Sequence, residues 1–372
     1  MTRFLSAALA LTLVTSASDT LQNATSGLPP RLEQYLKSRM KLSEDQRRDL
    51  VAGGPVTKLV NVDESSELGI FGAIWIDAPI RRYVEAVTDI EQFERGGAFL
   101  VTRRISAPPR LEDFAELRLR EKDVADLRTC KVGDCAVKLD ANTIQALRAE
   151  VDWKTPEAAA TVNRALQRFA LFYVNGYLEA GNARLAVYRD KSRPTAVAEE
   201  FGAMVQHVPE LTPSVGEMRR YLLEYPNVAP GDATSFLYWQ ETDFGLKPTI
   251  RISHMAVREG QDDTVVASKM LYASHYFWTG LEVRVLLPDP SRGPGFWLVN
   301  FNFGRSDGLG GFTGRIVRVW VRSAAQKKML AALRATKRRV EGPREAADAP
   351  TPRLFAHQPT AWPSLRWSDP AR

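Results

Sequence analysis

The last third of the chain alternates between apolar and polar positions with a period of two. The alternating runs are TIRISHMAV, VVASKMLYASHYFWTGLEVRVLL and GFWLVNFNFG, separated by the turn-rich segments EGQDD and PDPSRGPG. Successive side chains of a strand point to opposite faces of a sheet, so this alternation predicts strands. We therefore expect three or four strands between Lys247 and Gly304.

The first part of the chain predicts the order strand, helix, strand. VTKLVNV and LGIFGAIWI are strand-like, and AFLVTRRIS is a further strand that ends before Pro108 and Pro109. Between them, residues 77–95 are predicted to be helical, because apolar residues recur at helical spacing and two glycines follow. A charged, helical segment is expected over residues 28–52, before the GGP that ends it.

The middle of the chain is predicted to be helical, and so is its last ordered segment. Capping signals and apolar spacing predict helices at 139–153, 155–181, 195–206 and 213–224, with a shorter one at 233–245. These form a helical insertion at about 139–245. Residues 311–341 are long enough for about eight turns of helix. Beyond them, residues 342–372 are rich in Pro and Ala and are expected to be a disordered tail.

The first 18 residues have the pattern of a secretory signal peptide. Arg3 is basic, residues 4–14 are nearly all apolar, and small residues follow. The alternative is a buried first helix, since about eleven apolar residues are too few to cross a bilayer. We expect the mature protein, residues 28–341 with its tail, to be soluble and exported, in the periplasm or outside the cell.

Export changes the interpretation of the two cysteines, Cys130 and Cys135. They lie in TCKVGDCAV, where Gly133 and Asp134 provide turn residues for a small loop. In an oxidising compartment this pair is expected to form a structural disulfide, with two unpaired thiols as the alternative. The spacing is not that of a usual zinc site, and no metal is expected.

Basic residues are concentrated near the end of the chain. The net charge is +6, and residues 311–341 contain nine Lys or Arg and one Glu. Arg315, Arg318 and Arg322 share one helical face, which predicts either a solvated face or transient contact with an anionic membrane. Export makes nucleic acid a poor candidate partner. Trp320 lies on the opposite side and is expected to face an apolar interior.

The order of elements resembles that of the START-like, or helix-grip, superfamily. The resemblance covers residues 56–108 and 247–341, rests on element order alone and is interrupted by the helical insertion. It implies an α+β fold, in which a curved antiparallel sheet grips a long C-terminal helix and leaves an apolar tunnel between them. A fold alone gives only a prior about function. The chain is also similar to uncharacterised exported bacterial proteins.

Three polar residues are predicted on the inner face of the sheet. If residues 265–287 form one unbroken strand, Lys269 and His275 share a face with Leu281 and Val283, and His254 has the same parity in its own strand. Burying these groups unpaired is costly, so they are expected either to orient a ligand's head group or to be satisfied by neighbouring groups. A bulge at Gly280 would reverse the register.

The sequence therefore favours a protein that binds or carries an apolar ligand, such as a lipid. The expected ligand contacts are Lys269, His254, His275, Trp297, Phe301 and Trp320. No nucleophile elbow, zinc-protease motif, phosphate loop or dinucleotide fingerprint is present, and no cofactor is expected. The alternatives are an enzyme, a cyclase or hydrolase acting on an apolar substrate in the same cavity, and an envelope interaction module.

Overall fold

The computed structural model describes residues 27–342, except residues 64, 229–232, 244, 246 and 308–310. For residues 311–317 the structure describes the backbone but not the side chains. The expected signal peptide, residues 1–18, lies outside the described residues, and so does the expected tail beyond Gly342.

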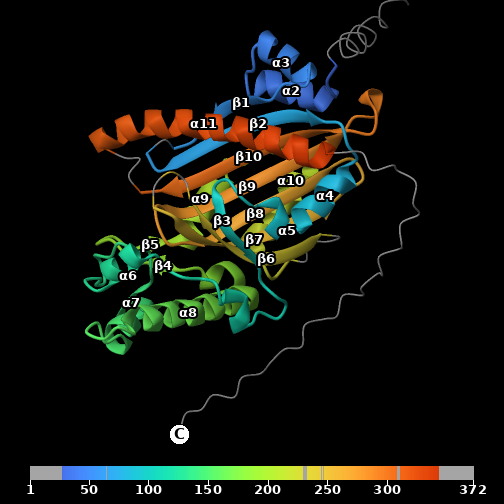
Figure 1. Cartoon of the computed structure of the whole chain (residues 1–372). Helices are drawn as coiled ribbons and strands as arrows, with labels where there is room; N and C mark the ends of the chain where they lie inside the picture. The colour runs from blue at the N-terminus through green and yellow to red at the C-terminus, as the bar shows by residue number, and fades with distance from the viewer. Residues whose placement is uncertain are drawn as a thin grey trace, which may run out of the picture. The chain divides into compact units, whose positions relative to one another are not determined.

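The centre of the fold is an eight-stranded antiparallel sheet with the order β1-β2-β10-β9-β8-β7-β6-β3 (Figure 1). Together with the helices that cover it, this sheet confirms the predicted α+β class and the run of antiparallel strands. A second, two-stranded sheet pairs β4 with β5. The strands are β1 (Val56–Val60), β2 (Glu67–Ile76), β3 (Phe99–Arg104), β4 (Val187–Tyr188), β5 (Thr195–Ala196), β6 (Thr234–Thr242), β7 (Thr249–Glu259), β8 (Thr264–Ala273), β9 (Phe277–Pro288) and β10 (Phe296–Ser306).

The long final helix is confirmed, and most other helices lie close to where the sequence predicts them; the helix at Glu121–Leu127 was not predicted. Among the described residues, no helix combines the length and the apolar character required to cross a bilayer. The helices are α2 (Pro30–Ser38), α3 (Glu44–Val51), α4 (Ile80–Thr88), α5 (Ile90–Phe93), α6 (Glu121–Leu127), α7 (Ala141–Glu150), α8 (Ala158–Ala180), α9 (Val197–Val205), α10 (Pro213–Glu224) and α11 (Gly311–Glu341), with short 3-10 turns at Leu111–Phe114, Gly181–Arg184 and Pro290–Arg292.

Both faces of the sheet are covered by helices, which gives three layers. One face packs against α11, α4 and α5, and we call it the α11 face. The other packs against α2, α9 and α10, with α8 over the β6–β7 end, and we call it the α10 face. Figure 1 shows α11 and α4 in front of the sheet and α9 and α10 behind it. Helices α4 and α5 connect β2 to β3, the edge strand at the opposite side of the sheet.

The C-terminal half of α11 packs directly against β2. Met329, Leu333 and Val340 are buried on the sheet, and a Cβ atom at Gly72 would lie 2.9 Å from side-chain atoms of Met329 and Leu333. Glycine at position 72 therefore allows the helix to approach closely. No space for a ligand remains between α11 and β2 at this point.

The expected orientation of the first half of α11 is wrong. Trp320 was expected to face an interior but is 60% exposed. Arg318 and Arg322, which were expected to face solvent, are half-buried. Positions 318, 322 and 329 differ by four and seven residues, so the two arginines lie on the side of the helix that Met329 turns to the sheet. Arg315 falls among the side chains outside the description.

The segment from Val265 to Leu287 is not one strand. It forms β8 and β9, which pair with each other and are joined by a tight turn at residues 274–276. Tyr276 adopts a positive φ of 58° in this turn. Pairing is continuous through Gly280, which lies opposite Met270 and Gly304, so the suggested bulge at that glycine is also wrong.

The short helix predicted at residues 233–245 is instead strand β6. It pairs with both β3 and β7, and so belongs to the main sheet. The inserted helices therefore end before residue 234, earlier than the expected boundary near 245. Upstream of them, Cys130 and Cys135 form the predicted disulfide, with an S–S distance of 2.10 Å.

Candidate functional site

The α10 face carries four of the six residues predicted to contact a ligand. Register places Trp297 and Phe301 on this face, and His254 lies directly opposite Lys269. All four are buried beneath α2, α9, α10 and α8. The final helix lies on the other face, so the prediction that it covers these residues is wrong.

Lys269 lies in a cage of aromatic side chains and carbonyl oxygens. Its Nζ donates to the carbonyl oxygen of Leu222 at 3.1 Å and to Asn182 Oδ1, and it lies 4.1 Å from the Phe201 ring centre and 5.2 Å from that of Tyr177. None of these contacts is a carboxylate. Burial therefore lowers the pKa of Lys269 from 10.5 to about 7.

His254 is enclosed by the rings of Tyr177, Tyr221 and Tyr225. Its Nδ1 lies 2.9 Å from the Tyr177 hydroxyl, and its Nε2 lies 3.4 Å from the Tyr221 hydroxyl. A neutral imidazole satisfies both contacts, since one nitrogen accepts and the other donates. Burial, together with the nearby charge of Lys269, lowers the pKa of His254 to about 3.

His275 is separated from the other two because it lies in the β8–β9 turn. Its Nε2 is 3.0 Å from Asp123 Oδ2, and its Nδ1 is 3.1 Å from the carbonyl oxygen of Ala136. Lys247 Nζ reaches Asp123 Oδ1 at 2.9 Å and Asp126 Oδ2 at 2.7 Å. Burial acts to raise the pKa of Asp123, but the hydrogen bonds from His275 and Lys247 outweigh it and hold this pKa below its ordinary value of 3.8.

The predicted aromatic contacts pack against other side chains. Trp297 stacks edge-on against Trp75 with ring centres 5.0 Å apart, and its Nε1 donates to Asp289 Oδ2 at 3.0 Å. Phe301 contacts the rings of Tyr35 and Phe71. Thus Lys269, His254, His275 and Trp297 are satisfied by neighbouring groups of the chain, which is the alternative that the sequence left open.

The α11 face carries a second polar cluster, whose residues are not among the predicted ligand contacts. We define the Arg284 cluster as Tyr83, Glu94, Glu282, Arg284 and Asn300. Arg284 Nε donates to Glu282 Oε1 at 2.9 Å, Arg284 Nη2 donates to Glu282 Oε2 at 2.5 Å, and Asn300 Nδ2 donates to Glu282 Oε1 at 2.7 Å. Glu94 lies 3.9 Å from Arg284 Nη2.

Three buried atoms of the Arg284 cluster have no hydrogen-bond partner within the described protein: Tyr83 Oη, Arg284 Nη1 and Asn300 Oδ1. Their residues are 0, 7 and 6% exposed. Each unsatisfied buried polar group costs about 1–3 kcal/mol, so several in one cluster call for an explanation such as water or a ligand. The cluster approaches solvent at Asn302, which is exposed two residues further along the same face of β10.

Burial also shifts the titration of the cluster's acids. Desolvation raises the pKa of Glu94 despite the opposing charges of Arg284 and Arg251. It likewise raises the pKa of Tyr83 to about 12, so its hydroxyl keeps its proton. The rings of Phe93 and Phe296, each 5.9 Å from that of Tyr83, provide the apolar surroundings.

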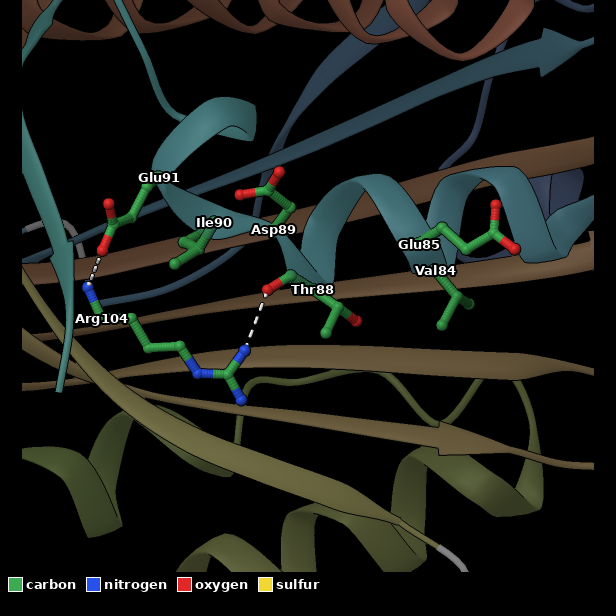
Figure 2. A pocket seen from close by; sticks show the side chains of 7 residues that line it. All are labelled: Val84, Glu85, Thr88, Asp89, Ile90, Glu91 and Arg104. Carbon is green, nitrogen blue, oxygen red and sulfur yellow. Dashed lines mark hydrogen bonds between the residues drawn. The ribbon is translucent and has the colours of Figure 1, made fainter. Parts of the chain in front are cut away.

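A groove with a volume of about 560 Å³ lies outside the cluster, between α4, α5 and β3 (Figure 2). Its size falls in the range of small-molecule sites, roughly 300–1,000 Å³. Arg104 forms one wall, where its Nη1 donates to the Thr88 carbonyl at 3.2 Å and its backbone N–H donates to Glu91 at 2.9 Å. The lining residues are Val84, Glu85, Thr88, Asp89, Ile90, Glu91 and Arg104.

Tyr238 lies next to Arg104, which lines the groove. It pairs directly with Arg104 across β3 and β6, and its hydroxyl hydrogen-bonds to Ser268 at 2.8 Å. Burial raises the pKa of Tyr238, and the charge of Glu94 adds to this effect. The segment of residues 83–94 supplies lining residues of the groove and also Tyr83 and Glu94 of the cluster, although none of the five cluster residues lines the groove itself.

The sequence carried a partial signal for this cluster. Alternation placed Glu282, Arg284 and Asn300 on one side of their strands, opposite the apolar face. Polar residues in such positions normally face water, and only the covering α4–α5 segment buries them. Nothing in the local pattern around Tyr83 or Glu94 predicts that contact.

Among the described residues, no group of three or more potential metal ligands converges on one point. The comparisons with known proteins give no assignment: no family model matches the chain, and no curated protein matches it.

Proposed function

We propose that the protein binds a small, largely apolar molecule on the α11 face of its sheet, with the molecule's polar group at the Arg284 cluster. The observation that carries this proposal is the group of three buried polar atoms without partners in that cluster. The groove between α4, α5 and β3 supplies space for the rest of the molecule. The sequence placed the cavity between the sheet and the C-terminal helix; the proposal moves the site beneath α4 and α5 and replaces the residues of the α10 face.

The chemistry of the cluster favours a neutral polar group. Arg284 Nη1 and Tyr83 Oη offer donors, and Asn300 Oδ1 offers an acceptor. The carboxylates of Glu94 and Glu282 are balanced by the guanidinium groups of Arg284 and Arg251, so a charged ligand would leave a buried charge without compensation. A hydroxyl or carboxamide both donates and accepts, and it fits without changing that balance.

The apolar part of the ligand has matching surroundings on the same face. Val84 and Ile90 line the groove and also belong to the hydrophobic cluster beneath α4 and α11. The Arg104 guanidinium lies over the Phe236 ring, 4.1 Å from its centre, in a cation–π contact. The proposed ligand class is therefore a long-chain alcohol, amide or similar lipid with an uncharged head group.

Native mass spectrometry of the purified protein, followed by organic extraction, tests the proposal. We expect the wild type to carry a neutral molecule or to take up a long-chain alcohol, and Tyr83→Phe to lose at least tenfold in occupancy. This variant removes a hydroxyl that makes no hydrogen bond of good geometry, although the Arg284 side chain lies close to it, so we expect little loss of fold stability. A wild type that binds none of a panel of long-chain alcohols, amides and monoacylglycerols would contradict the proposal.

Tyr173→Phe provides the matched control. Its hydroxyl is also buried, but it lies on the α10 side, where it donates to the Leu271 carbonyl at 2.7 Å and accepts from the Ala186 N–H at 3.2 Å. Its loss should cost about 1–2 kcal/mol of stability and leave occupancy unchanged. Equal loss of occupancy in both variants would show that ligand retention follows stability and not the Arg284 cluster.

We further propose that the protein acts outside the cytoplasm. The Cys130–Cys135 disulfide supports this, because such bonds persist mainly in oxidising compartments. The signal-like pattern of the first 18 residues supports it as well. Cell fractionation should recover a shortened chain in the exported fraction, and a full-length chain retained in the cytoplasm would contradict the proposal.

A further inference from the structure

The side of α11 that faces away from the sheet has a distinct composition. Trp320, Lys327, Arg334 and Arg338 are all exposed and are spaced by seven, seven and four residues. Since seven residues make about two turns, these four side chains form one line, which we call the outer stripe. Over 18 residues at about 1.5 Å each, the stripe is about 27 Å long.

The position of the outer stripe is fixed by the opposite side of the helix. Met329, Leu333 and Val340 are buried on the sheet, so the stripe points away from the protein. At the C-terminal end, Lys337 donates to the Trp75 carbonyl at 2.8 Å and Glu341 accepts from the Asp77 N–H at 2.6 Å. The helix therefore presents the stripe from a firmly attached support.

The charge of the outer stripe is not neutralised locally. Within the described residues, no ion pair joins Lys327, Arg334 or Arg338 to a carboxylate. The only acidic residue of α11, Glu341, pairs with Lys337 at 2.5 Å. The stripe is a run of positive charge with no acidic side chain of its own helix beside it.

An apolar patch lies at one end of this run of charge. Val319 is 68% exposed and Trp320 is 60% exposed, and both are among the most exposed large apolar residues described. Tryptophan is favoured at the boundary between lipid head groups and acyl chains, and lysine and arginine are attracted to anionic lipids. A nucleic acid would account for the charge but not for the exposed Val319.

We infer that the outer stripe docks the protein on an anionic lipid bilayer, with Trp320 at the level of the head groups. The contact uses Lys327, Arg334 and Arg338 in place of the Arg315, Arg318 and Arg322 face expected from the sequence. Each basic residue near an anionic surface contributes about fivefold in partitioning. The inference does not depend on the ligand proposed for the Arg284 cluster.

Vesicle co-sedimentation tests this inference. The probes are vesicles of phosphatidylcholine alone and of phosphatidylcholine with 30% phosphatidylglycerol, at about 0.1 M salt. We expect the full chain to bind only the anionic vesicles, and Lys327→Gln/Arg334→Gln/Arg338→Gln to partition about 100-fold more weakly. Trp320→Ser should weaken binding to anionic vesicles while keeping the charge.

The matched control is Arg31→Gln/Arg118→Gln/Lys122→Gln, which removes the same charge from exposed positions outside α11. It should retain nearly all binding. Equal weakening in the control and stripe variants would show a general charge effect and overturn the inference. So would equal binding to both vesicle types, or tighter binding to a 20-base-pair DNA duplex at the same salt.

Discussion

The Nζ atom of Lys269 lies 4.1 Å from the centre of the Phe201 ring, and the Lys269 side chain is completely buried. Its other contacts are an amide oxygen and a backbone carbonyl oxygen. These groups solvate an ammonium only partly, and none of them carries a compensating negative charge. As a consequence, the buried lysine loses its proton near pH 7 instead of near pH 10.5, and the stability of the protein should depend on pH above 7.

Lys269 should make stability depend on pH between about 7 and 10.5. Burial lowers its pKa from 10.5 to about 7. In that window the unfolded chain binds the proton and the folded chain does not, so folding becomes more favourable as pH rises, by up to about 1.4 kcal/mol per unit. Below pH 7 both states are protonated and this dependence ends.

Urea unfolding of the wild type and Lys269→Met at pH 7, 8 and 9 measures this effect. The wild type should gain stability relative to Lys269→Met by roughly 1 kcal/mol per pH unit. The difference in unfolding free energy between the two proteins isolates the effect of Lys269, because tyrosines, which also begin to titrate above pH 9, contribute equally to both. A constant difference from pH 7 to 9 would mean that Lys269 is charged in the folded protein.

His254 should remain neutral in mildly acidic solution. Its pKa is lowered to about 3, so the folded protein excludes a proton that the unfolded chain binds below pH 6.5. The contribution of His254 to the free energy of unfolding has its full value above pH 6.5 and is lost as the pH falls toward 3. Imidazole NMR should show no titration of His254 between pH 5 and 8, and a midpoint near 6.5 would contradict its enclosure by the three tyrosines.

Asp123 should contribute strongly to stability because it joins His275 to Lys247. Asp123→Asn leaves buried His275 without its carboxylate and should cost about 3 kcal/mol, as for other buried pairs that lose one partner. Asp126→Asn is the control, since Asp126 also binds Lys247 but its side chain is 32% exposed, and it should cost at most about 1 kcal/mol. Chemical denaturation compares them, and equal costs would argue against a special role for the His275 contact.

Gly72 should be required for the close packing of α11. In Gly72→Ala, the added methyl group would come within 2.9 Å of Met329 and Leu333, and we expect a loss of about 1–2 kcal/mol from overpacking. Gly304→Ala is the comparison, because its added carbon would make only ordinary contacts at 3.7 Å with Phe277. Thermal unfolding should separate the two variants, and an equal response would mean that α11 shifts without cost.

The sequence predicted the strands and helices that have a clear periodicity, and it failed where both sides of an element are covered. In β6, Phe236 and Tyr238 face α4 and α5, while Leu237 and Trp239 face the core beneath α8. A strand buried on both faces loses its polar alternation, so this segment resembled a helix. The β8–β9 turn was missed because Tyr276 takes the positive φ that glycine or asparagine usually signals.

The position of the candidate site depended on a choice of face that local patterns do not determine. Both faces of β9 and β10 are buried, so the apolar residues Val283 and Phe301 indicated a core but not which helix covers it. The close approach of α11 at Gly72 fixes the answer, and it is a long-range contact. The resemblance to the START-like superfamily stays a prediction, since the sheet and final helix establish only the α+β class.

The central claim is that a molecule stabilises the Arg284 cluster by pairing its three unsatisfied atoms. Its most direct test compares the melting temperature of the wild type before and after the ligand is removed. The protein is unfolded in denaturant, extracted with organic solvent and then refolded. We predict that the stripped protein melts several degrees lower and regains its stability when the extract is returned, while Tyr83→Phe melts at the same temperature in all three states. Identical melting temperatures for native and stripped wild type, with no rise when long-chain alcohols, amides or monoacylglycerols are added, would contradict the claim.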